Sequence, residues 1–190
     1  MKAVAYKAPG PISHEHALED ITLDKPGAEG RDLLVRIKAV SVNPVDTKLR
    51  LNVAPEADAW RVLGFDAAGI VAEVGPDVEL FKVGDPVFYA GSIARPGTNS
   101  EFHRVDERIV GRKPTSLNDA EAAALPLTAI TAWEMLFDRL QVNHAPPQGG
   151  HTLLLIGGAG GVGSITIQLL RALTDLTVIA TASRPETQEW

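Results

Sequence analysis

A run of glycines near the end of the sequence has the residue types and spacing of a phosphate-binding turn. The run, LLLIGGAGGVGS, covers residues 153–164, follows a strand-like apolar stretch and contains the pattern G-x-G-x-x-G. In this pattern the first glycine permits a tight turn, the second lets the backbone approach a pyrophosphate, and the third lets a helix pack closely on the strand. A helix that begins near Gly161 would also point its free N–H groups at the phosphates. The sequence therefore predicts a dinucleotide-binding site made of Gly158, Gly160, Gly161, Val162 and Gly163.

The segments that flank this turn favour binding over a glycine-rich turn with no ligand. Thr152–Ile156 is typical of a buried strand, and Leu176–Ala182 of a second one. Between them we expect a helix whose apolar stripe comprises Val162, Ile165, Leu169 and Leu173. Strand, glycine turn, helix and strand make a βαβ unit with parallel strands.

The end of the second predicted strand indicates which dinucleotide is bound. An NAD enzyme usually carries Asp or Glu there to hold the ribose 2′-hydroxyl, whereas this sequence has Ala182 followed by Ser183 and Arg184. A small residue leaves room for a 2′-phosphate, which a hydroxyl and a guanidinium can bind. The alternative is an ordinary exposed arginine at a strand end. We expect NADPH as the cofactor, bound in part by Ser183 and Arg184.

The rest of the chain predicts a β-rich domain followed by helices. Strand-like stretches are interrupted by Gly, Pro and Asp, which suggests a closed or partly closed β-barrel; these stretches are Met1–Tyr6, Leu33–Val42, Leu63–Val74 and Pro86–Ala90. A Ser-x-x-Asp capping signal at Ser116 predicts a helix that ends at Pro126. A further helical face follows, with Ile130, Trp133, Phe137 and Leu140. The composition of residues 143–150 is that of a linker.

Composition excludes several classes of protein. The chain has 190 residues, a net charge of −6 and no cysteine. Disulfides and thiolate metal sites are therefore absent, and the lack of Lys/Arg clusters argues against a nucleic-acid or anionic-membrane partner. The sequence has no 18-residue apolar run, and its first residues include no apolar run long enough for a signal peptide. We expect a soluble, cytoplasmic protein that acts on a small-molecule substrate.

Several stretches, in this order and spacing, resemble the medium-chain dehydrogenase/reductase superfamily. They are KAVSVNPVDTKLR, VLGFDAAGIVAEVG, VGDPVFYAGS, AAALPLTAITAWEML and LLLIGGAGGVGSITIQLL. Within that superfamily they are most similar to the quinone oxidoreductase and zinc-type alcohol dehydrogenase-like branch. The resemblance implies an α/β plus β architecture, with a GroES-like β-barrel catalytic domain over residues 1–126. It implies the first part of an NADP-binding Rossmann domain over residues 127–190, and a homodimer for the full-length protein.

The resemblance also bears on zinc. Zinc-dependent relatives carry Cys where Asn43 stands and Gly-His-Glu where Gly64-Phe65-Asp66 stands. Phe65 cannot bind a metal, and two carboxylates, Asp46 and Asp66, make a poor Zn²⁺ site without His or Cys. We expect these aspartates to hold loops by accepting backbone N–H groups, and we expect no metal. A zinc-type alcohol dehydrogenase remains an alternative.

Without a metal, the chemistry that the resemblance implies is hydride transfer from NADPH to a quinone or an activated C=C or carbonyl substrate. Asn43 matches a position beside the nicotinamide, although as a lone residue it is equally a turn residue before Pro44. Thr128 matches a position that contacts the nicotinamide end of the cofactor. The proton donor is left open between Lys48, Tyr89 and water. His103 is expected to be structural.

The chain ends soon after one βαβ unit, whereas a doubly wound dinucleotide domain needs about six strands. We therefore expect the N-terminal part of a longer oxidoreductase, with poor activity on its own. The alternative from another class is a non-catalytic NADPH-binding or scaffolding module on the same fold.

Overall fold

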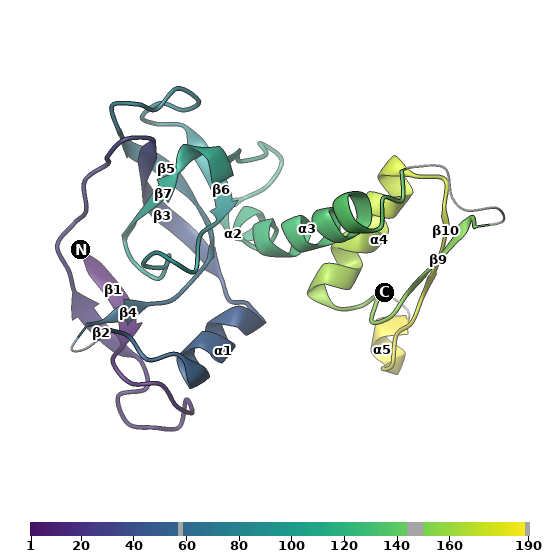
Figure 1. The fold of residues 1–190 in the computed structure, drawn as a ribbon, viewed down its shortest axis with the longest axis horizontal. Helices are drawn as coiled ribbons and strands as arrows, with labels where there is room; N and C mark the ends of the chain where they lie inside the picture. Colours follow the sequence, from purple (N-terminus) through teal and green to yellow (C-terminus); the bar gives the residue numbers. More distant parts are fainter. Residues whose placement is uncertain (57–58, 144–149, 189–190) are drawn as a thin grey trace. The chain divides into compact units, whose positions relative to one another are not determined.

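The computed structural model describes residues 1–56, 59–143 and 150–188. The chain divides into two compact units, Met1–Leu127 and Thr128–Trp190, and each is described by itself (Figure 1). None of the described helices is both long and apolar enough to cross a membrane. The predicted assignment of a catalytic domain to residues 1–126 and a nucleotide-binding domain to residues 127–190 stays a prediction.

The first unit contains a five-stranded antiparallel sheet in the order β7-β3-β5-β6-β8 (Figure 1). Its strands are β3 (Asp32–Ser41), β5 (Asp66–Val74), β6 (Pro86–Ala90), β7 (Phe102–Asp106) and β8 (Gly111–Arg112). The long strands β3 and β5 pair along most of their length, with irregularities after Leu34 and after Ile37. The predicted strand at 33–42 is confirmed, whereas the one at 63–74 begins only at Asp66. Gly64 explains the difference, because its φ of +97° is incompatible with a strand.

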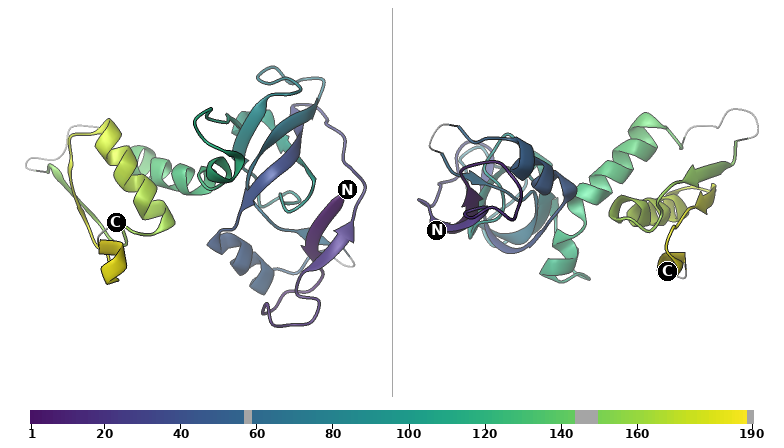
Figure 2. Two further views of the ribbon diagram at one scale, coloured as in Figure 1. Left: turned by 180° about the vertical axis from the view of Figure 1, so that it is seen from behind. Right: turned by 90° about the horizontal axis from the view of Figure 1, so that it is seen from below.

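A second sheet of the first unit joins the start of the chain to residues further along. Its order is β2-β1-β4, with β1 (Lys2–Tyr6), β2 (Glu19–Thr22) and the short β4 (Arg61–Val62), all antiparallel. Figure 2 shows this sheet beside the five-stranded one within the same unit. Over the described residues the two sheets remain open, so the expected β-barrel is not closed. The two-residue strands β4 and β8 are too short to extend the ladders around a full circle.

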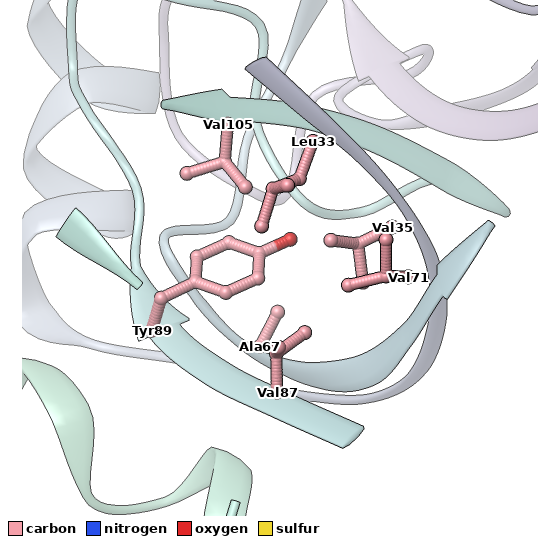
Figure 3. Packing of buried hydrophobic residues seen from close by; sticks show 7 residues of the cluster. All are labelled: Leu33, Val35, Ala67, Val71, Val87, Tyr89 and Val105. Atoms are coloured by element: carbon pink, nitrogen blue, oxygen red, sulfur yellow. The ribbon is translucent and has the colours of Figure 1, made fainter. Parts of the chain in front are cut away.

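The core of the five-stranded sheet is built from side chains that alternate along its strands. In Figure 3 they surround one aromatic ring, that of Tyr89; the cluster comprises Leu33, Val35, Ala67, Val71, Val87, Tyr89 and Val105. Each of these side chains is at most 2% exposed. This alternation of inward and outward residues is what made the strands recognisable from the sequence.

The two α-helices of the first unit that precede Pro126 each begin directly after an asparagine that acts as the N-cap. In the first unit α1 covers Pro44–Asn52, η1 is the 3₁₀ turn Glu107–Ile109, and α2 covers Asp119–Ala123. The cap of α2 is Asn118, whose side chain accepts from Glu121 N while Glu121 accepts from Asn118 N. The prediction of Ser116 as the cap was therefore wrong by two residues, because Asn118 and Glu121 form the reciprocal pair.

The helical stretch after Pro126 differs from its predicted face. α3 covers Pro126–Trp133, and η2, with π-helical bonding, covers Glu134–Arg139. Ala132 and Leu136 are buried, whereas three members of the predicted face are about half exposed or more, namely Ile130, Trp133 and Leu140. The wider π turn changes which residues share a face, so a strict helical period does not hold across residue 134.

The second unit forms the predicted βαβ unit. β9 (Thr152–Leu155) pairs in parallel with β10 (Thr177–Ala180), and α4 (Gly161–Leu173) connects them. A short helix, α5 (Pro185–Gln188), follows. The buried side of α4 is Gly163, Thr166 and Leu170. The predicted apolar stripe, which began at Val162, was therefore wrong, because each buried residue lies one position after a predicted one. Most of the predicted linker, residues 144–149, lies outside the described residues.

Candidate functional site

The glycine turn between β9 and α4 is shaped by contacts that only glycine tolerates. Gly157 has φ +78°, so the tight turn falls there and not at Gly158 as predicted. A Cβ on Gly158 would lie 2.9 Å from Ala180 Cβ. A Cβ on Gly163 would overlap Gly157 O and lie 2.7 Å from Gly158 O. The third glycine thus permits close packing of α4, but against the turn and not against the strand as predicted.

Gly160 differs from its neighbours, because the protein itself leaves room for a side chain there. The nearest atom to a Cβ on Gly160 would be Gly157 O at 3.4 Å, an ordinary contact, and the φ of −77° suits any residue. Neither packing nor backbone conformation explains a glycine at this position. Close approach of a ligand to the backbone does explain it, which is the predicted role of the second glycine.

The start of α4 presents donors at the same place. Gly160 is the N-cap, and the first backbone bond of the helix runs from Ser164 N to Gly160 O at 2.8 Å. The N–H groups of Gly161, Val162 and Gly163 therefore have no acceptor within the helix. Thr128 lies beside them, with its methyl carbon 3.3 Å from where a Cβ of Gly161 would be. Thr128, predicted from the resemblance alone, is thus next to the glycine turn.

A cavity of about 820 Å³ extends from this turn to the end of β10 and the last residues of α5. Its lining includes residues that the sequence analysis did not single out, namely Ala159, Ser164, Ile167, Gln168, Ala180, Thr181, Thr187 and Gln188, besides Gly158 and Ala182. None of these residues is charged. Thr181 is the most informative of them, because its Oγ1 accepts Gly157 N at 3.0 Å and its O accepts Gly158 N at 2.9 Å. No signal in the sequence indicated this role, because Thr181 lies within the predicted strand Leu176–Ala182, whereas β10 ends at Ala180.

Ser183 and Arg184 are both exposed, in the segment between the lining residues Ala182 and Thr187. The Arg184 side chain is 70% exposed, and its Nε lies 3.8 Å from Glu186 Oε1, at the long limit of an ion pair. Solvent weakens such a pair, so the guanidinium is available to another anion. The ribose end of a dinucleotide would meet no carboxylate among the residues that line the cavity.

In the first unit, three polar side chains form a buried cluster around Asn43. Asn43 is the N-cap of α1, and its N–H donates to Asp46 Oδ2 at 2.8 Å. Asp46 Oδ1 accepts Gly64 N at 2.9 Å. Asp66 Oδ2 accepts from Asn43 Nδ2 at 2.8 Å, and its Oδ1 accepts Leu127 N at 2.8 Å. The prediction that these aspartates hold loops is confirmed, and Asp66 in addition binds the Asn43 side chain.

Burial raises the pKa of Asp66 to about 6, although bonds from Asn43 and Leu127 oppose the rise. The negative charge of Asp46 adds to the increase. Asp66 has no exposed surface, so its ionised form lacks solvation by water and depends on these donors.

The donor set at this place does not fit zinc. Phe65 has no ligand atom, and all four carboxylate oxygens of Asp46 and Asp66 already accept N–H groups. No group of three or more His, Asp or Glu side chains within the described ranges is arranged to hold a metal ion. No step of the chemistry proposed for this chain passes through a metal.

Two of the proposed proton donors have very different surroundings. Lys48 is exposed on α1. Tyr89 is 2% exposed, in the core of Figure 3, and its hydroxyl lies 3.0 Å from His103 Nδ1. Burial raises the pKa of Tyr89 far above its usual range. The interpretation of Tyr89 as a proton donor is therefore corrected, because its hydroxyl has no access to a substrate.

His103 is structural, as expected. Its Nε2 lies 3.0 Å from Pro96 O, and because a carbonyl only accepts, Nε2 carries the hydrogen. Nδ1 then accepts from Tyr89. Burial lowers the pKa of His103 to about 4, so the imidazole is neutral near pH 7.

Comparison with known proteins gives a consistent result. Residues 29–115 match the alcohol dehydrogenase GroES-like domain. A zinc-type alcohol dehydrogenase-like protein of Staphylococcus aureus strain Mu50 is 46% identical and is matched over 100% of this chain and 56% of its own length. The crystal structure of a putative zinc-dependent alcohol dehydrogenase from Rhizobium etli is 65% identical, with a TM-score of 0.96 over 100% of this chain and 55% of that one.

Two further solved structures are described with different cofactors. The Escherichia coli quinone oxidoreductase complexed with NADPH is 26% identical, with a TM-score of 0.80 over 100% of this chain and 55% of that one. An NAD-dependent alcohol dehydrogenase is 31% identical, with a TM-score of 0.85 over 100% of this chain and 60% of that one. The chain spans about half the length of the curated relatives it matches. By these matches it is similar over its whole length to members of the medium-chain dehydrogenase/reductase superfamily, which have a GroES-like domain followed by a Rossmann domain.

Proposed function

We propose that this chain is part of an oxidoreductase that binds NADPH and transfers a hydride to a quinone or to an activated C=C or carbonyl group without zinc. The observation that carries the proposal is Gly160: a side chain there would make only an ordinary contact with Gly157 O, directly before the N–H groups at the start of α4. A glycine that the protein does not need for its own packing is explained by a ligand that approaches the backbone.

The choice of NADPH over NADH rests on the end of β10. No carboxylate lines the cavity there, and Ser183 and the accessible Arg184 follow at once. A 2′-phosphate needs donors and positive charge, whereas a 2′-hydroxyl is usually held by an acidic side chain. One structural neighbour is a complex with NADPH and another is described as NAD-dependent, so the comparisons leave this choice to the residues of this chain.

Each candidate residue has a role in this proposal. The N–H groups of Gly161, Val162 and Gly163 hold the pyrophosphate, Gly160 lets it approach, and Gly158 allows the turn to pack against Ala180. Thr128 and Asn43 contact the nicotinamide end or the substrate carbonyl. The bound cofactor supplies a hydride, and a proton from water or from Lys48 completes the reduction. Assembly as a homodimer and a cytoplasmic location stay predictions.

Titration of the protein with NADPH and with NADH, followed by the quench of tryptophan fluorescence, tests the proposal. We expect NADPH to bind more tightly. Arg184→Ala should weaken NADPH about tenfold or more and leave NADH unchanged, because a charge-assisted hydrogen bond is worth about 1.5–3 kcal/mol. Arg171→Ala is the matched control, since Arg171 is an exposed arginine in the last turn of α4. Equal affinity for both dinucleotides would contradict the 2′-phosphate assignment, and binding of neither would contradict the site.

A further inference from the structure

Asp66 joins two segments that the sequence keeps far apart. One carboxylate oxygen accepts from the Asn43 side chain, at the start of α1. The other accepts from Leu127 N, in the first turn of α3 and directly before Thr128. The carboxyl group has no exposed surface, so these bonds are not exchanged with bulk water. Asp66 therefore binds the side-chain amide of Asn43, and it also binds the backbone N–H of the residue before Thr128.

The ionised carboxylate dictates which end of the Asn43 amide faces it. A carboxylate is only an acceptor, so at 2.8 Å it must be met by the NH₂ group and not by the amide oxygen. The amide oxygen then lies on the opposite side. The Asn43 backbone cannot turn to compensate, because its N–H is held by Asp46 Oδ2. A protonated Asp66 would remove this constraint, since its O–H could donate to the amide oxygen instead.

We propose that Asp66 is a positioning residue, whose ionised carboxylate fixes the direction of the Asn43 amide and whose protonation lets the amide reverse. The inference rests on the proposed function in one respect only, namely that Asn43 contacts the cofactor or the substrate. An amide held in one direction offers its ligand a fixed pattern of donor and acceptor. When the amide reverses, donor and acceptor are exchanged.

The surroundings of Asp66 allow this protonation near neutral pH. The strand partners, Ser41 of β3 and Ala90 of β6, bring no charge. Thr98 contributes only a hydroxyl, which bonds the Asp66 backbone oxygen at 3.4 Å, and α3 contributes only the N–H of Leu127. From α1 comes one charged group, Asp46, which disfavours a second negative charge. Burial and this like charge together raise the pKa of Asp66 to about 6.

The first test is the pH dependence of the asparagine side-chain amide signals in the NMR spectrum of the protein. The sequence contains only five asparagines, so ¹⁵N-asparagine labelling gives few signals. We expect the Asn43 NH₂ signals to shift with a midpoint near pH 6 and to lose this shift in Asp66→Asn. Asn52 is the matched control in the same helix, because its Nδ2 donates at 2.8 Å to Lys48 O, which does not titrate. Asn43 signals that follow those of Asn52 from pH 4.5 to 7.5 would overturn the inference.

The second test relates the amide to the ligand. In addition to the pH dependence that ionisation of the 2′-phosphate at about pH 6 gives every variant, we expect Asp66 to change the NADPH dissociation constant of the wild type about threefold between pH 5 and pH 7.5, as one redirected hydrogen bond would produce. Asp66→Asn should remove that change, whereas Asp85→Asn should keep it. Asp85 is also a buried carboxylate that accepts one backbone N–H, from Lys82. If Asp66→Asn keeps this threefold change, the positioning role is wrong. If NADPH does not bind at all, the proposed function fails, and the amide signals still decide the inference.

Discussion

Each glycine of the turn after β9 meets different neighbours, so glycine is needed at each position for a different reason. Gly157 supplies a positive φ, and Gly163 lets α4 approach the turn to within contact of Gly158 O. Gly160 has neither constraint. The same residue type thus serves conformation at one position and packing at another, and we propose ligand access as the reason for the glycine at position 160. A pair of alanine substitutions can separate these roles.

We predict that Gly163→Ala mainly lowers stability, whereas Gly160→Ala mainly weakens NADPH binding. Gly163→Ala should lower the free energy of unfolding by about 1–3 kcal/mol, because its Cβ would overlap the backbone oxygens of Gly157 and Gly158. Gly160→Ala should leave stability nearly unchanged and weaken NADPH binding. Urea denaturation and NADPH titration of both variants measure the two effects. A Gly160→Ala protein that binds NADPH as tightly as the wild type would contradict the role proposed for this position.

At this scale the sequence predicted the glycine turn but not the surroundings of single side chains. The spacing of the glycines is local, so it is visible in the sequence. Tyr89 and Asp66 depend on contacts between distant segments: Tyr89 bonds to His103 of another strand, and Asp66 bonds to Asn43 and Leu127. Nothing in the residues next to Tyr89 or Asp66 indicates these partners.

At the scale of elements, α4 shows how packing selects a helix face. The sequence offers two apolar faces, since leucines and isoleucines occur on both sides of the helix. Gly163, which lies against the turn, shares its buried side of the helix with Thr166 and Leu170. Leu173, on the predicted face, is 52% exposed. The Thr166 hydroxyl is accommodated because it donates to Val162 O at 2.7 Å.

We predict that the two leucines of α4 differ in their contribution to stability. Leu170→Ala should cost about 2–5 kcal/mol, because it empties a site with no exposed surface, whereas Leu173→Ala should cost less than about 1 kcal/mol. Urea denaturation followed by tryptophan fluorescence measures the difference. Similar costs for both variants would mean that the face predicted from the sequence is also a packing face.

Elements with strong local signals were predicted, and their boundaries were less accurate. Alternating apolar residues indicated β3 and β6, and β9-α4-β10 follows from the glycine turn between two apolar stretches. The start of β5 was missed because the positive φ of Gly64, whose N–H donates to the distant Asp46, is not evident from the neighbouring residues. Whether the predicted barrel is closed or only partly closed was left open for a similar reason, since strand length at the sheet edges is decided by pairing between distant segments.

At the scale of the whole molecule, two buried groups of the first unit give stability opposite dependences on pH. The pKa of Asp66 is raised to about 6 in the folded protein, so the folded state holds this proton more tightly than the unfolded state does. Its contribution to stability falls as pH rises from about 4 to 6. The pKa of His103 is lowered to about 4, so the unfolded state binds that proton more tightly. Its contribution rises as pH increases from about 4 to 6.5.

Because the two windows overlap, we predict that the dependences largely cancel in the wild type and separate in single variants. The unfolding free energy of the wild type minus that of Asp66→Asn should fall by about 2 kcal/mol between pH 4.5 and 7.5. The same difference for His103→Gln should rise by a similar amount. Urea denaturation at four pH values gives both differences, and a constant destabilisation by either substitution does not affect their slopes. If both differences change with pH in the same direction, the prediction is wrong for one of the two groups. That group would then be ionised in the folded protein at a pH where burial should keep it neutral.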